Sequence, residues 1–73
     1  MLLIYSFVSG MDYKPMISSI EFRGNDTTKD YIIEREIQHQ INTVLDSSLA
    51  EEDRDRLDNL GLFSEVKWQA VPL

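Results

Sequence analysis

Few side chains in this sequence could do chemistry, and none has the neighbours that chemistry needs. His39 is the only histidine, and there is no cysteine. A general base or a zinc site requires partner groups at a set spacing, and none accompanies His39. Ser47 and Ser48 stand outside the Gly-x-Ser-x-Gly context of a nucleophile elbow. The sequence therefore predicts no catalytic, metal or cofactor-binding residue, with His39 as a helix residue and the serines as helix caps.

The densest charged run, residues 51–58, mixes acids with two arginines. It fails as an EF-hand because Leu57 occupies a position that needs an oxygen ligand and the turn glycine is missing. Interspersed acids and arginines are typical of a solvated helix face. Gly24-Asn25 does not open a phosphate loop, because no Gly-Lys pair follows it, and it predicts a tight turn.

Length and charge narrow the class of protein. A chain of 73 residues forms one domain at most, and without cysteine no disulfide can reinforce its small core. The net charge of −6 argues against binding to nucleic acid, whose phosphates demand a basic face, and against docking on anionic lipid. The missing cysteines fit a cytosolic and a periplasmic protein equally.

The first ten residues are apolar and uncharged. They are too few to span a membrane, which takes about 20 apolar residues. Two interpretations remain open: the end of a signal peptide with Val8-Ser9-Gly10 as its cleavage site, or a β-strand, which Ile4 and Tyr5 favour. Residues 10–15 are then a turn or linker, and we divide the chain into an amino-terminal segment, 1–15, and a domain, 16–73.

Within the domain, apolar periodicity predicts a strand, two helices and a second strand. Residues 16–23 alternate as a half-buried strand, with Ile17 on the face opposite Ile20 and Phe22. A helix is expected from about residue 29 to about residue 41, capped by Thr27 or Thr28. Its apolar stripe is drawn by Ile32, Ile33, Ile37 and Ile41.

The second helix is expected to begin at Ser48, which forms a capping box with Glu51, and to end at Gly61. The acids at residues 51–53 then occupy its first turn, where the helix dipole favours them. Residues 63–71 alternate as the second strand. Trp68 shares a face with apolar neighbours there, so we interpret it as a core residue rather than an exposed anchor.

These elements resemble a POTRA domain, the polypeptide-transport-associated module of BamA-type outer-membrane assembly (surface antigen) proteins. The resemblance covers about residues 16–71 and depends on two linked pieces in the right order. The first is Ile17-x-x-Ile20-x-Phe22-x-Gly24-Asn25 followed by Thr28-Lys29-Asp30-Tyr31-Ile32-Ile33-x-Arg35-Glu36-Ile37. The second is Arg56-Leu57-x-Asn59-Leu60-Gly61-Leu62-Phe63-Ser64-x-Val66.

The resemblance implies an α+β fold in which two helices pack on one face of a small mixed sheet. The family's order is β-α-α-β-β, and this chain ends at Leu73, where the final strand should begin. We therefore expect an excised, truncated or free-standing form. Residues 2–8 could supply the missing strand within the chain, or in a neighbour to give a strand-swapped homodimer. Residues 42–48 also lack the family's usual glycine-containing bend.

The resemblance also implies a non-catalytic, periplasmic function in front of a membrane β-barrel, with unfolded or nascent outer-membrane polypeptides and accessory assembly proteins as partners. We expect binding by β-augmentation, in which an extended segment pairs with an exposed sheet edge. The edge favoured is residues 63–71, with the partner-binding residues Phe63, Glu65, Val66, Lys67, Trp68 and Gln69.

Two other classes of function stay open at this stage. The first is a scaffolding domain that docks fixed partners, as in bacterial cell-division proteins. The second, a small α+β enzyme, is disfavoured by the absence of clustered histidine, cysteine or paired acids.

Overall fold

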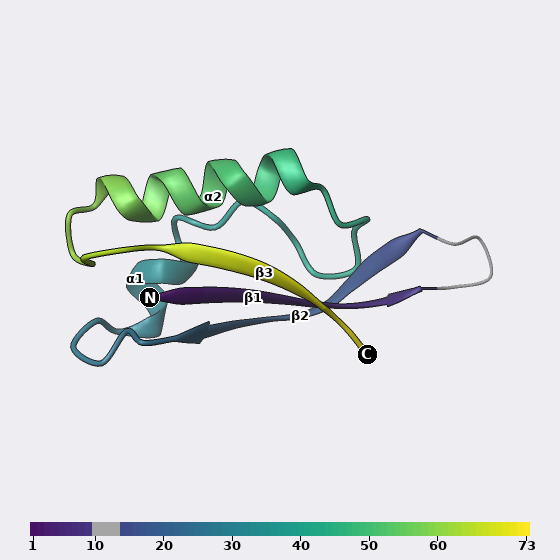
Figure 1. The fold of residues 1–73 in the computed structure, drawn as a ribbon, viewed down its shortest axis with the longest axis horizontal. Helices are drawn as coiled ribbons and strands as arrows, with labels where there is room; N and C mark the ends of the chain where they lie inside the picture. Colours follow the sequence, from purple (N-terminus) through teal and green to yellow (C-terminus); the bar gives the residue numbers. More distant parts are fainter. Residues whose placement is uncertain (10–13) are drawn as a thin grey trace.

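The computed structural model describes residues 1–9 and 14–73 and has an α+β fold, as the sequence predicts. In chain order its elements are strands β1 (Leu2–Ser9) and β2 (Pro15–Arg23), helices α1 (Asp30–Glu34) and α2 (Ser47–Asn59), and strand β3 (Lys67–Pro72). Figure 1 shows α2 lying along the sheet on the side of β3. Most of the linker expected at residues 10–15 lies outside the described residues.

The amino-terminal strand is the middle strand of the sheet, whose order is β2-β1-β3 (Figure 1). It pairs antiparallel with β2, where Leu3 faces Phe22, and parallel with β3, where Leu3 faces Trp68. Residues 1–9 thus hold together the two strands of the predicted domain, because β2 and β3 do not pair with each other.

An irregularity in β2 changes the face on which Ile17 lies. The pairing with β1 shifts register between Ser6 and Phe7, which face Ser19 and Ile17 respectively, so Ser18 is an extra residue. This bulge puts Ile17 on the core face, where it is fully buried. Strict alternation, which placed Ile17 opposite Ile20 and Phe22, was wrong because it assumed an unbroken pleat.

One hydrophobic core lies between the helices and one face of the sheet. Partly buried side chains extend it, and among them is Trp68, as expected for a core tryptophan. Tyr5 contributes an aromatic edge contact to Trp68, with ring centroids 6.0 Å apart. The fully buried apolar members are Leu3, Tyr5, Ile17, Ile33, Ala50, Leu57 and Val66.

The first helix is much shorter than the predicted span of residues 29–41. Helix α1 covers only Asp30–Glu34, and Ile41, assigned to its apolar stripe, is half exposed. The chain turns out of the helix because the main-chain N–H groups of Gln38 and His39 donate to the carboxylate of Asp53 on α2. A buried charged acceptor holds these donors more strongly than another helical turn would.

The second helix begins earlier than its sequence pattern indicates. Its N-cap is Asp46, whose Oδ1 accepts hydrogen bonds from the N–H groups of Ser48 (2.9 Å) and Leu49 (3.2 Å). The predicted Ser48–Glu51 capping box is therefore wrong, and the first turn holds no acid. Gly61 follows the helix with φ +71°, the left-handed conformation expected of its C′ residue.

The last strand is shorter than residues 63–71 at its start and longer by one residue at its end, since β3 is Lys67–Pro72. Residues 63–66 precede the strand instead of belonging to it: Phe63 packs against the core and Val66 is fully buried.

In the described parts of the chain, no helix is long and apolar enough to cross a bilayer. The same residues contain no group of three or more His, Cys, Asp or Glu able to hold a metal ion.

The capping assignment has a direct test. We expect Asp46→Ala to lower the free energy of unfolding by about 1 kcal/mol, because the first N–H groups of α2 lose their acceptor. Ser48→Ala should change it little, since Ser48 lies inside the helix and alanine has the better helix propensity. Urea unfolding followed by circular dichroism compares them; a larger loss for Ser48→Ala would restore the capping box.

The central position of β1 predicts that a chain beginning at Met11 loses its fold. Without β1, neither β2 nor β3 has a strand beside it, and unpaired strands are not stable alone. We expect collapsed dispersion in the amide NMR spectrum, and its recovery when a peptide of residues 1–14 is added. A shortened chain that stays folded and monomeric would show that β1 is dispensable.

Candidate functional site

The densest polar cluster in the described structure surrounds the buried carboxylate of Asp53. The Tyr5 hydroxyl donates to its Oδ2 at 3.0 Å, and the N–H groups of Gln38 and His39 donate at 2.9 and 3.1 Å. Arg56, one helical turn further on, supplies the opposite charge. Asp53 was expected on a solvated helix face and is instead fully buried, so this part of the prediction was wrong.

The proton of Tyr5 stays on its oxygen in this cluster. Burial raises the pKa of the Tyr5 hydroxyl far above its ordinary value, and the negative charge of Asp53 raises it further. Tyr5 is therefore a fixed hydrogen-bond donor rather than an acid or a base near neutral pH. Each carboxylate oxygen of Asp53 accepts from two donors, so the cluster ties β1, the segment between the helices and α2 together.

His39 lies in the segment between the two helices and contacts Tyr5 of the same cluster. Its Nε2 accepts a hydrogen bond from the N–H of Asp46 at 3.0 Å, and its ring lies against Tyr5, with centroids 5.3 Å apart. The prediction of a helix residue was wrong about the element. The side chain joins the segment between the helices to the start of α2.

The outer edge of β3 has no strand beside it in the described sheet. Lys67 N–H donates to the Met1 carbonyl at 3.1 Å, and Leu73 N–H donates to the Phe7 carbonyl at 2.9 Å. In a parallel pair, alternate residues direct both main-chain groups to the same neighbour. The N–H and C=O of Trp68 and Ala70 therefore point away from β1, and no described residue hydrogen bonds to them.

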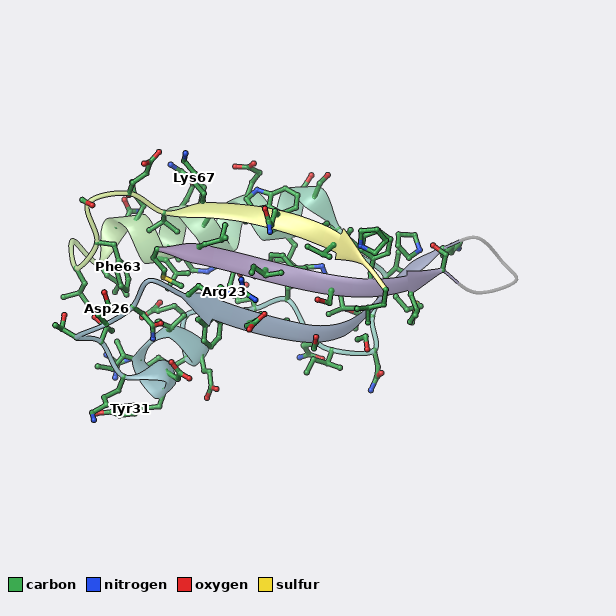
Figure 2. All side chains as sticks on the ribbon, turned by 60° about the horizontal axis from the view of Figure 1, so that its bottom comes forward. Arg23, Asp26, Tyr31, Phe63 and Lys67 are labelled. Carbon is green, nitrogen blue, oxygen red and sulfur yellow. The ribbon has the colours of Figure 1, made fainter. Side chains whose placement is uncertain are left out.

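The six predicted partner-binding residues do not form one surface. Lys67 and Gln69 are exposed on β3, while Trp68 is partly buried. Val66 is fully buried, and Phe63 packs against the core in the connection before the strand. Figure 2 shows Lys67 at the start of β3 and Phe63 in that connection. Glu65 is exposed beside Lys67, 3.5 Å from its ammonium, and its carbonyl accepts from the amino terminus.

Two residues of α2 border this edge and were not predicted as part of it. Arg54 donates from Nε to the Val66 carbonyl at 2.9 Å, and Glu51 accepts from the Trp68 indole N–H at 2.7 Å. The sequence signal was their spacing, since residues three apart share one helix face. Nothing in the pattern says that this face reaches the last strand.

The opposite edge of the sheet is partly covered. Ile17 N–H donates to the Thr43 carbonyl, and the Ile17 carbonyl accepts from Asn42 N–H, at 2.9 and 2.8 Å. Leu45 N–H donates to the Pro15 carbonyl at 2.8 Å. Asn42 takes a positive φ of 67° to make this contact. The start of β2 is thereby occupied by the chain's own connection between the helices.

Comparison with known proteins agrees with this architecture. The sequence matches the POTRA family, described as surface antigen variable number repeat, over residues 15–72. The chain belongs to the POTRA family. It is also 32% identical over 60 residues to the outer membrane protein assembly factor BamA of Neisseria meningitidis serogroup B. That alignment covers 82% of this chain and 8% of the relative. No solved structure matches this chain significantly.

The POTRA match leaves β1 entirely outside its range, since the match starts at residue 15 and β1 ends at Ser9. In this chain the sheet therefore combines two strands from the matched region with one from the segment before it. The family resemblance inferred from Ile17 to Ile37 and from Arg56 to Val66 is confirmed.

Removing the carboxylate of Asp53 should be strongly destabilising. We expect Asp53→Ala to cost about 3–5 kcal/mol, because Arg56 loses its buried counter-charge and two main-chain N–H groups lose their acceptor. Asp55→Ala, at an exposed neighbouring position, is the matched control and should stay within about 0.5 kcal/mol. Urea unfolding measures both, and similar losses would contradict the central role of Asp53.

The raised pKa of Tyr5 predicts a loss of stability in alkali. The unfolded chain releases the tyrosine proton near pH 10, whereas the folded chain keeps it. The folded state therefore binds more protons, so its stability is complete below about pH 10 and declines as the pH rises further. Unfolding free energies measured from pH 8 to 11 should fall more steeply for the wild type than for Tyr5→Phe. Equal slopes would contradict the prediction.

Proposed function

We propose that this POTRA domain is a non-catalytic protein-interaction module of an outer-membrane protein assembly or translocation machine, acting in the periplasm. The family match and the BamA relative support this proposal. The described structure adds that its buried polar cluster is closed by internal hydrogen bonds. The chain spans 8% of the relative's length. The proposal includes a membrane β-barrel that is joined to this domain in its parent protein.

The proposed mechanism is β-augmentation at the outer edge of β3. The observation that carries it is the pair of outward-directed residues, Trp68 and Ala70, whose N–H and C=O groups have no partner among the described residues. An added strand would satisfy these groups with its own main chain. Main-chain pairing tolerates many sequences, which suits a receiver of unfolded or nascent outer-membrane polypeptides and of accessory assembly proteins.

The edge is short, so binding should be weak. Beyond Ala70 the next outward residue is Pro72, which has no N–H to donate. Few main-chain bonds and few buried side chains give little affinity. A weak, sequence-tolerant contact allows a client chain to be passed on. The net charge of −6 argues against binding to nucleic acid.

Titration with a strand-forming peptide tests the mechanism. A five-residue peptide of alternating valine and lysine, blocked at both ends, is added to the isotope-labelled chain. We expect the largest amide shifts at residues 68–71, and equal titration of a peptide with a proline at its centre should give much smaller ones. Shifts confined to β2, or no shifts, would contradict pairing at β3.

The strand-swapped homodimer remains a second arrangement of the same sheet. In one chain β1 lies between β2 and β3, and the same pairing can form with the β1 of a neighbour. Light scattering across a dilution series separates the two arrangements. A monomer at all concentrations supports closure within the chain, and a dimer that dissociates on dilution supports exchange between chains.

A further inference from the structure

The amino-terminal end of the β3 edge is already occupied by a side chain. Because Lys67 points its main-chain groups to β1, the peptide carbonyl of Val66 before it points outward, along the same edge as Trp68 and Ala70. Arg54 reaches this carbonyl from α2 with its Nε, at 2.9 Å. A strand added to the edge must compete with this bond in order to pair there.

The Arg54 side chain is held in this position from both ends. Its Nη1 donates to the Asp55 carboxylate at 2.7 Å, so the guanidinium bridges the helix and the edge. About a third of the side chain is exposed, at 34%. It is therefore ordered enough to occupy the Val66 carbonyl and accessible enough to be displaced. At the other end of the edge, Pro72 lacks an N–H, so the fully open groups are those of Trp68 and Ala70.

The side of α2 next to this edge is acidic. A residue paired with Trp68 or Ala70 places its side chain on the same face of the sheet as they do, which is the face covered by α2. There it meets Glu51, an exposed acid that accepts from the Trp68 indole, and Asp55, which binds Arg54. Opposite charge at these positions favours a lysine or arginine in the added strand.

We propose that Arg54 is a gate at the start of the β3 edge, and that the edge selects a short extended segment with a basic residue facing α2. With Arg54 in place, a partner pairs only with Trp68 and Ala70. With Arg54 displaced, the Val66 carbonyl becomes a further acceptor and the paired stretch lengthens toward the amino-terminal end of β3. This inference rests on the proposed function, because it concerns the same edge.

The experiment compares two peptide lengths on two proteins. The probes are the blocked peptide Val-Lys-Val-Lys-Val and a nine-residue form that adds Thr-Val on each side, which lengthens the strand without adding charge. The variant is Arg54→Met, which keeps the aliphatic stem but removes the donor. The control is Arg23→Met, which removes an exposed arginine at the end of β2 (Figure 2). The amide spectrum of each variant first establishes that it is folded.

In the wild type and in Arg23→Met we expect both peptides to bind with Kd values within about twofold, because the extra residues gain no main-chain acceptor. In Arg54→Met the longer peptide should bind about threefold to tenfold tighter than the shorter one, the effect of one added hydrogen bond. The amide of Lys67 shares its peptide unit with the Val66 carbonyl, so its shift on binding should appear only in Arg54→Met.

The remaining outcomes separate the inference from the function beneath it. If the longer peptide gains equally in all three proteins while β3 amides shift, Arg54 is not a gate and β-augmentation stands. If no peptide shifts the β3 amides, both fail. A matched Val-Glu-Val-Glu-Val peptide should bind at least about twofold more weakly than the lysine peptide at low salt. Equal or tighter binding would overturn the selection for a basic residue.

Discussion

The buried carboxylate of Asp53 is the interaction on which the rest of this structure depends. It joins β1 through Tyr5, the segment between the helices through Gln38 and His39, and the next turn of α2 through Arg56. A buried charge is costly unless every lone pair is used. The donors must therefore come together in one arrangement, and this requirement ends α1 early and sets the approach of α2 to the sheet.

With α2 placed in this way, the two edges of the sheet acquire different properties. The segment between the helices contacts Asp53 through Gln38 and His39. It then continues along the start of β2 and hydrogen bonds to Pro15 and Ile17. The same helix brings Arg54 and Glu51 to β3, where they contact the edge without covering it. The start of one edge is thus occupied by the chain itself, whereas the edge of β3 has no strand beside it.

The middle strand links the fold to its proposed function. Because β1 lies between two strands that belong to the matched POTRA region, the sheet has a strand from the preceding segment at its centre. The edge strand β3 has a neighbour on one side only. An edge of this kind is able to pair with a further chain. In the proposed mechanism, the charged residues beside the edge and the proline at its end would restrict that pairing to short segments.

The sequence by itself determined the class of fold, the order of most elements and the family. Local signals sufficed for these: alternation in residues 16–23, the left-handed glycine after α2, and the spacing of the two POTRA pieces. Apolar composition also indicated a strand in the first residues, but could not distinguish it from the end of a signal peptide. The tertiary structure decided where that strand lies, where α1 ends, and which acid is buried.

The physical reason is that these features depend on partners distant in sequence. Asp53 looks like its exposed neighbours Glu52 and Asp55, and only the arrival of Tyr5, 48 residues earlier in the chain, distinguishes it. The bulge at Ser18 is set by pairing with β1, and the contact of Arg54 with Val66 by the approach of α2 to β3. Periodicity describes which face of an element is apolar, whereas the edge that remains open is decided by how the elements meet.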